Sequence, residues 1–541
     1  MSRRKKTWLI IAASSVAVVI GILFVIGYYL SRRFEPFIRE QAIAYLQDRF
    51  KSEVELASLS IGMPELSTLR LAWTRGRGAL AHVTGEGVVL RHHGRRDLPP
   101  MLTMKEFSFD VDLASVLAPT KVVQLVEIRG MEINIPPKGQ RPQLTGDSPE
   151  PDKSDSGGGG GGRGIFIQQI MIDDCVLMTL PRDPKKKPLR FDIHRLKLES
   201  VSNIDAMQYD AALTNAKPPG EILSQGTFGP WNADEPGDSP LAGHYVFDKA
   251  DLGVFRGIAG ILHSTGDFVG TLSEIDVHGE ATVPNFRLRS ANNPVPLKTT
   301  FEVLVDGTNG DTILKPVVGT LGKTTFTTSG TVIKDNPTDR RKTISLDVNM
   351  PNGDLRDILK LAVKGEPFME GRLMLKTKID IPPLSGPVRE KLRLDGSFEI
   401  TDGKFLKSTV QDQIDTMSRR AQGQPNNKEI DEVVSAMGGT FVLDDQVMTF
   451  SSVSFSVPGS GVDLKGTYDL GNDVLDFHGT LRLDAKISQT MSGWKRWLLK
   501  PIDPFFSKDG SGTLLKIQVV GSKDQPKFGR DRGNDKDDDK K

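Results

Sequence analysis

Residues 107–113 read Phe-Ser-Phe-Asp-Val-Asp-Leu, and this stretch decides the fold class. Apolar side chains at positions 107, 109, 111 and 113 alternate with polar ones at 108, 110 and 112. Successive side chains of a β-strand point to opposite faces, so this spacing gives one apolar and one polar face. The stretch therefore predicts a half-buried β-strand.

The same alternation recurs along most of the chain. Turn residues separate the alternating segments: one segment ends at Asp306-Gly307, the chain turns at 471–473, and Asp402-Gly403 predicts a hairpin. After Gly130 the phase slips, as a β-bulge would produce. The 54 glycines and 33 prolines fit frequent turns and few long helices. We expect an antiparallel meander whose further alternating segments include 170–180, 189–193, 275–283, 301–305, 344–350, 398–405 and 462–483.

The apolar face of such a sheet has two possible uses. Facing sheets could cover each other in a stack of β-sandwiches. Alternatively, a curved sheet could line a groove for an acyl chain, and alternation alone does not separate these arrangements. In the groove interpretation, the candidate lipid-lining residues are Phe107, Phe109, Val111, Phe301, Val303, Val305, Leu346, Val348, Val462 and Leu464.

The N-terminal region contains the longest apolar run. Residues 8–30 (WLIIAASSVAVVIGILFVIGYYL) carry no charge over 23 residues. At about 1.5 Å per residue they would span roughly 35 Å, enough for a hydrocarbon core of about 30 Å. Four basic residues at 3–6 precede the run, which favours a cytoplasmic N-terminus and a body on the far side. We expect a transmembrane anchor; the alternative is a cleaved signal peptide, whose apolar region is usually shorter.

Short amphipathic helices are expected at residues 34–50, 354–364 and within 409–437. The first would cap the sheet or lie on a membrane surface. A cluster near the C-terminus combines aromatic and aliphatic side chains with nearby Lys and Arg, which suits a bilayer surface or a plug at the open end of the sheet. These candidate membrane-contacting residues are Trp494, Trp497, Leu498, Phe505 and Phe506.

Composition shifts suggest domain boundaries. Residues 145–164 (TGDSPEPDKSDSGGGGGGRG) form an expected flexible linker, because they offer almost nothing to bury. The expected organisation is a cytoplasmic tip and anchor at 1–33, a helix and β region at 34–144, the linker at 145–164, a central β-rich region at 165–390, a C-terminal β region at 391–529 and a disordered charged tail at 530–541. The fold class is thus mainly β: an N-terminal transmembrane helix, then an elongated, curved, groove-like antiparallel sheet with a few short amphipathic helices.

Chemistry-bearing motifs are scarce in this sequence. The formal net charge of +1 lacks the basic excess of a nucleic-acid binder. The eight histidines show no metal-binding spacing, and no nucleophile or phosphate-loop motif is present. Cys175, the single cysteine, is expected to fill a strand position as a small apolar residue. We therefore expect no catalytic site, cofactor or metal.

Several segments of the C-terminal half form one recognisable series, together with the apolar run and helix at the N-terminus. They are 301–311 (FEVLVDGTNGD), 392–405 (LRLDGSFEITDGKF), the expected helical insert at 411–437, 438–443 (GGTFVL), 461–470 (GVDLKGTYDL) and 498–521, which begins LLKPID. This series resembles the AsmA family of bacterial envelope proteins, relatives of the chorein-type lipid-transfer proteins. The resemblance implies an inner-membrane protein whose body lies in the periplasm and whose β-groove carries phospholipids between the inner and outer membranes. A different hypothesis is a non-enzymatic scaffold or assembly factor that binds outer-membrane proteins through its sheet edges.

Overall fold

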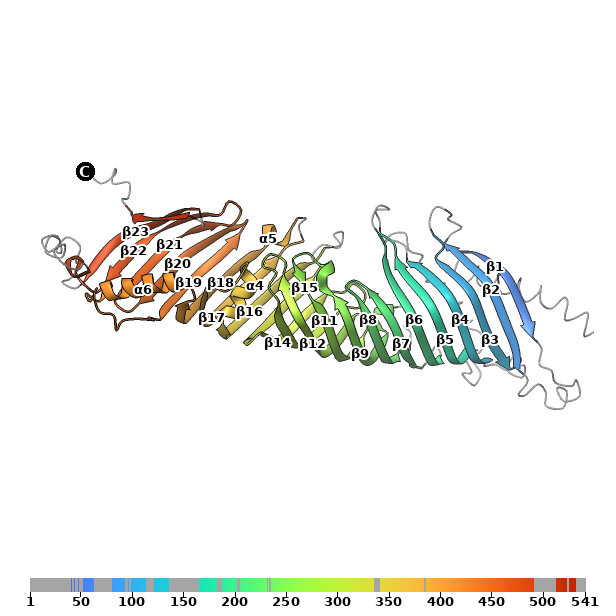
Figure 1. Ribbon diagram of the computed structural model, residues 1–541. Coiled ribbons are helices and arrows are strands. Elements are labelled where there is room, and N and C mark those ends of the chain that lie inside the picture. The colour runs from blue at the N-terminus through green and yellow to red at the C-terminus, as the bar shows by residue number, and fades with distance from the viewer. Residues whose placement is uncertain are drawn as a thin grey trace, which may run out of the picture. The chain divides into compact units, whose positions relative to one another are not determined.

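A computed structural model gives the structure, and its described residues form two compact units (Figure 1). The N-terminal unit comprises residues 1–245 and the C-terminal unit residues 246–541. The domain boundaries expected from the sequence, among them 144/145, 164/165 and 390/391, stay predictions. The structure describes residues 52–62, 80–92, 99–112, 121–135, 165–181, 187–201, 205–230, 235–334, 341–383, 386–490, 512–522 and 525–531, with the single positions 40, 43, 47, 96 and 232.

Eight strands lie within the described part of the N-terminal unit. Consecutive strands pair antiparallel, except that β4 and β5 pair in parallel. The connection between β4 and β5 contains the expected linker 145–164 and lies outside the described residues. The strands are β1 (Ser52–Gly62), β2 (Leu80–His92), β3 (Leu102–Asp112), β4 (Lys121–Ile135), β5 (Ile165–Thr179), β6 (Leu189–Val201), β7 (Met207–Ala216) and β8 (Pro219–Phe228).

In the C-terminal unit the assigned pairs are all antiparallel among the described residues. β9 (Pro240–Asp251) contains the unit boundary. The other strands are β10 (Ile258–Ala259), β11 (Ile261–Thr271), β12 (Glu274–Leu288), β13 (Val295–Val305), β14 (Thr312–Leu321), β15 (Thr324–Ile333), β16 (Thr343–Asp354), β17 (Met369–Ile381), β18 (Arg393–Phe405), β19 (Ser435–Asp444), β20 (Val447–Val457), β21 (Ser460–Asp469), β22 (Val474–Leu483), β23 (Thr513–Ser522) and β24 (Gln525–Arg530).

Helices are short and few in the described part of the chain. The expected helix at 354–364 is confirmed as α4 (Leu355–Ala362), with the Asp354 side chain accepting the Arg356 N–H as N-cap. Only the first half of 409–437 is helical, because α6 (Ser408–Ala421) stops before Gly423, which has a φ of 74°. The remaining elements are α5 (Val388–Lys391), η1 (Pro236–Asp238), η2 (Leu252–Val254) and η3 (Ile487–Thr490).

The expected fold class needs correction at its N-terminus. No helix among the described residues is long and apolar enough to cross a membrane. The run at 8–30, where the anchor was expected, lies outside those residues. The structure supports a mainly β fold of 24 described strands assigned to one sheet, without the transmembrane helix of the expected fold class.

The hairpin expected at Asp402-Gly403 is also wrong, because β18 continues through both residues. Asp402 adopts a φ of 55°, and the register of β18 against β19 shifts between Ile400 and Gly403. A left-handed residue followed by glycine therefore makes a bulge inside one strand here, not a turn between two. The turns at Asp306-Gly307 and at 471–473 are confirmed, since β13 ends at Val305 and β14 begins at Thr312, and β21 ends at Asp469 and β22 begins at Val474.

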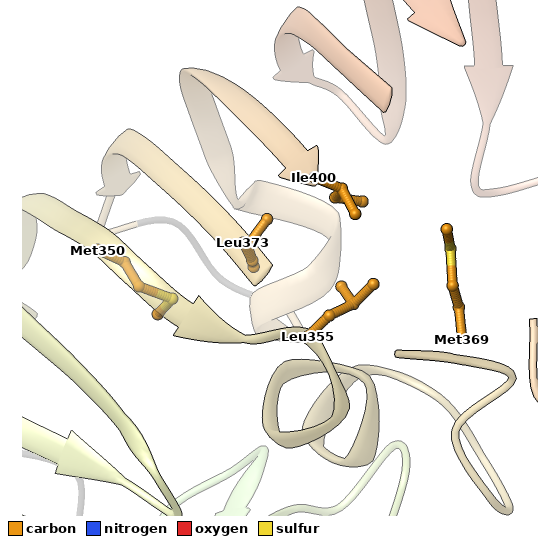
Figure 2. Packing of buried hydrophobic residues seen from close by; sticks show 5 residues of the cluster. All are labelled: Met350, Leu355, Met369, Leu373 and Ile400. Carbon is orange, nitrogen blue, oxygen red and sulfur yellow. The ribbon is translucent and has the colours of Figure 1, made fainter. Parts of the chain in front are cut away.

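Within each unit the described strands form a single layer. The described strands are assigned to one sheet and pair side by side, each with its neighbours in the chain except around the short β10, where β9 pairs with β11 and β10 with β12 (Figure 1). The stacked-sandwich alternative is therefore not found in this part of the chain. Buried apolar side chains gather in three clusters, and the largest lies beneath α4 (Figure 2), formed by Met350, Leu355, Met369, Leu373 and Ile400.

The two long edges of the sheet from β16 to β23 differ. Along one edge β16, β18, β20 and β22 end; α4 and α6 follow β16 and β18 there (Figure 1), and we call it the helix edge. Along the opposite edge β19 turns into β20 and β21 into β22, and we call it the turn edge. Most fully buried residues lie at the helix edge, whereas Leu443 is buried near the turn edge; the helix-edge set is Met350, Leu355, Met369, Leu373, Ile400, Ala421, Ser435, Val457, Ser460, Ala485 and Thr513.

Cys175 allows a direct test of the packing in the N-terminal unit. It is 2% exposed in β5 and packs with Met131 and Ile172, and burial raises the pKa of its thiol to about 11. We expect the native chain to resist a maleimide at pH 8 and the chain in concentrated urea to take up one equivalent, because only the exposed thiolate reacts. Mass spectrometry measures the labelling, and Ser454→Cys provides an exposed positive control. Rapid native labelling at Cys175 would contradict the assigned burial.

Candidate functional site: the apolar face of the C-terminal unit

One face of the sheet from β16 to β23 is built from three rows of directly paired residues, which we call the apolar face. Direct cross-strand partners lie on the same side of a sheet, so each row runs continuously across the strands. The rows are Leu346, Ile379, Leu394, Leu443, Met448, Tyr468 and Leu475; Val348, Thr377, Gly396, Phe441, Phe450, Gly466, Phe477 and Val519; and Met350, Leu375, Phe398, Gly439, Val453, Leu464, Gly479 and Ile517.

Aromatic rings form a continuous path across this face. Ring centroids are 6.3 Å apart between Phe398 and Phe441, 6.5 Å between Phe441 and Phe450, and 5.6 Å between Phe450 and Phe477. These are contact distances for tilted aromatic pairs. Phe398, Phe450 and Phe477 are only half-buried, so the path keeps an accessible surface after its rings have packed against each other.

The opposite face of the same strands is mainly polar. Two shallow depressions lie on it, lined by hydroxyl and charged side chains such as Ser454, Lys465 and Lys376. Exposed Met374 and Val442 are apolar exceptions. This face suits contact with water, so the two sides of one layer differ sharply in chemistry.

The expected lining residues of the C-terminal unit all lie on one side of the sheet. Pairing runs from Val303 through Leu314 and Gly330 to Leu346. By the two-residue period, the remaining expected residues of these strands share that side. Each is half-buried, and the set is Phe301, Val303, Val305, Leu346, Val348, Val462 and Leu464.

The other expected residues lie elsewhere. Phe107 and Phe109 are half-buried in β3 of the N-terminal unit, with stacked rings whose centroids are 6.1 Å apart. Val111 lies in the same strand. The expected membrane-contacting residues between 494 and 506 lie outside the described residues.

A buried carboxylate anchors α6 at the helix edge. Asp415 is 1% exposed and accepts hydrogen bonds from Val433 N–H at 3.0 Å, Glu432 N–H at 3.1 Å and Gln411 Nε2 at 2.9 Å. Burial alone would raise the pKa of Asp415, but these bonds and one involving Asp431 outweigh it and hold the pKa below its ordinary value.

A second aspartate holds α4. Asp357 is 8% exposed, and its Oδ2 accepts Lys323 N–H at 2.6 Å and the Thr324 hydroxyl at 3.2 Å. These bonds tie α4 to the turn between β14 and β15. At the other end of α4, Asn293 donates to the carbonyls of Val363 and Gly365. Both helices are therefore fixed through polar contacts to neighbouring loops.

One cluster of possible metal ligands lies in β12 and β13. Ligand atoms of Asp276, His278 and Glu302 lie within 4.8 Å of one another. Lys315 already donates to Asp276 at 2.9 Å and to Glu302. These hydrogen bonds, to Glu302 first and then Asp276, raise the pKa of Lys315 and keep its ammonium charged. The arrangement therefore suits an ion-pair network. The spacing of histidines along the sequence could not reveal this cluster, because its residues come from neighbouring strands.

Comparison with known proteins identifies no relative of this chain. No protein-family model, curated protein or solved structure matches this chain. The resemblance to the AsmA family consequently depends on the sequence segments alone.

The anchoring role of Asp415 can be tested by substitution. We expect Asp415→Ala to lower the free energy of unfolding by roughly 3 kcal/mol, because several buried donors lose their acceptor. Exposed Asp412 on the same helix is the matched control, and Asp412→Ala should stay within about 0.5 kcal/mol. Urea unfolding followed by circular dichroism measures both, and hydrogen exchange of 408–421 localises the change.

The contribution of Asp415 should also depend on pH. Because its folded-state pKa is depressed, the stabilisation is present above the unfolded pKa of about 4 and is lost as the pH falls through the folded value. Hydrogen exchange of α6 between pH 6 and pH 3 should show declining protection in the parent chain, and Asp415→Ala should flatten that decline. Equal decline in both chains would exclude the anchor.

Proposed function

We propose that this protein is a non-enzymatic lipid-handling protein that holds phospholipid acyl chains against its apolar face. The observation that carries the proposal is the continuous apolar face of the single layer from β16 to β23, most of whose side chains are only half-buried. Transfer of apolar surface from water to another apolar surface is favourable by about 25 cal/mol per Å². Large contiguous apolar patches on soluble surfaces mark interaction sites.

The chemistry of the face favours an acyl chain as the occupant. The rows offer aliphatic and phenyl groups with few hydrogen-bonding side chains, Thr377 and Tyr468 being the polar members. Such a lining provides dispersion contacts without direction and matches a flexible hydrocarbon. A peptide strand would leave backbone donors and acceptors unpaired there.

The headgroup would find a different environment at the turn edge. Charged side chains lie there, for example Arg393 and Asp444 as an ion pair at 2.9 Å with both side chains more than half exposed. The helix edge is instead closed by the buried set described above. We therefore place the acyl chains toward the helix edge and the headgroup toward the turn edge.

The resemblance to the AsmA family supports an envelope location, with the body in the bacterial periplasm and phospholipid moving between the inner and outer membranes. The alternative scaffold function needs an open sheet edge. The edge strand β24 is short and contains Pro526 beside Lys527, features that discourage strand addition. The lipid hypothesis is therefore the stronger proposal.

Lipid capture by the full chain provides the first test. The purified protein is incubated with vesicles of phosphatidylethanolamine and phosphatidylglycerol, separated by flotation, and examined by native mass spectrometry. Retained phospholipid supports the proposal. A chain that stays lipid-free after vesicle incubation, and carries none when purified without detergent, overturns it.

A charge placed on the apolar face gives a sharper test. Leu464 is half-buried on this face, and its exposed neighbour Lys465 lies on the polar face. We expect Leu464→Glu to reduce bound phospholipid at least tenfold while the thermal midpoint changes little, because no described second layer covers position 464. Lys465→Glu adds the same carboxylate on the opposite face and should retain lipid. Loss of the fold in Leu464→Glu would indicate a closed core instead.

A further inference from the structure

Glycine and phenylalanine face each other repeatedly across neighbouring strands. The arrangement occurs in both units and always on the apolar side. Glycine is otherwise unfavourable within a strand, since it adds backbone freedom and provides no side chain to pack. The direct pairs are Gly85–Phe107, Gly279–Phe301, Gly319–Phe326, Gly396–Phe441, Gly439–Phe398, Gly466–Phe450 and Gly466–Phe477.

In two pairs the ring occupies the space above its glycine. A Cβ added to Gly319 would overlap the outer ring atoms of Phe326, and one added to Gly85 would overlap those of Phe107. At both positions the three nearest atoms to the added Cβ belong to the ring, whereas at Gly396 and Gly466 the nearest atoms are mainly those of the neighbouring strand's backbone. The rings therefore extend sideways across the next strand.

A phenyl ring in this position rises only a short way above the plane of the sheet. Sheets that form sandwich cores use side chains that stand up and interdigitate with a facing sheet. A ring folded over glycine contributes aromatic area but little height, so it offers uniform dispersion contact. Such a surface lacks the side-chain barriers that would fix a bound chain at one position.

We infer that these glycines are positioning residues that hold the rings down, so that a bound acyl chain can move across the strands. This inference rests on the proposed lipid function and adds to it mobility along the face. Gly319 in β14, on the side of the sheet that carries Val303 and Leu346, and Gly85 in β2 of the N-terminal unit carry it most directly, because the three atoms nearest to an added Cβ there all belong to the ring. Alanine at either position would force the ring upward.

The experiment separates holding lipid from moving it. The full chain is loaded with a fluorescent phospholipid from donor vesicles, and transfer to acceptor vesicles is followed alongside the amount bound at equilibrium. We expect Gly319→Ala to slow transfer at least threefold while bound lipid changes less than twofold. Combining it with Phe326→Leu, which removes the outer ring atoms, should restore the rate; Phe326→Leu alone is the matched control.

The N-terminal unit provides an independent variant if Gly319→Ala does not fold. Gly85→Ala, with Phe107→Leu as its rescue, should show the same slowing and recovery. Folded Gly→Ala variants that transfer lipid at the parent rate would overturn the inference while leaving the lipid proposal intact. Slowing that the leucine rescue does not reverse would also overturn it, since it would indicate a general packing defect. A parent chain that binds no phospholipid would overturn the lipid proposal itself.

Discussion

Direct cross-strand pairing of apolar side chains is the interaction on which the rest of the C-terminal unit depends. From β16 to β23 the antiparallel ladder places apolar residues opposite one another or opposite glycine, with Thr377 and Tyr468 as the polar members, and repeats this in three rows. A one-residue slip in any strand would move its whole apolar set to the polar side. The rows therefore hold only if register is maintained, and the bulges must absorb irregularities without reversing the faces. The shift between Phe450 and Val453 does this, since both remain on the apolar face.

The two edges of this layer follow from how its strands are connected. At the turn edge short turns join β19 to β20 and β21 to β22, and the connection from β17 to β18 contains only the single-turn helix α5 among its described residues. At the helix edge the longer connections contain α4 and α6, which bury the strand ends. Burial of Asp357 and Asp415 is tolerable because each accepts several hydrogen bonds. Polar anchoring fixes the helices in place, and the apolar rows toward the turn edge stay accessible.

Much of the secondary structure could be predicted from the sequence, whereas the arrangement of the site could not. Alternation at 344–350 and 462–464 identifies strands because the two-residue period is a local property. The hairpin predicted at Asp402-Gly403 was wrong, since a left-handed aspartate before glycine suits a bulge as well as a turn. The row that joins Val303 to Leu346 depends on registers across four strands. The encounter of Lys315 with Asp276 and Glu302 is equally non-local. Short-range patterns carry no information on such pairings.

The glycines that face phenylalanine across neighbouring strands bring these considerations together. A sheet selected only for stability would favour β-branched residues where Gly319 and Gly85 stand, because these fill a pleated surface well. A sheet selected to receive a second layer would favour side chains that interdigitate. Glycine beneath a phenyl ring meets neither requirement fully, since the ring recovers only part of the packing that glycine loses. The pairing of glycine with a phenyl ring does preserve the strand register. It also keeps the surface apolar, with side chains that rise little above the sheet. A single layer that must remain uncovered and still fold is where this compromise is expected, so the glycine positions and the lipid proposal support each other through one physical requirement.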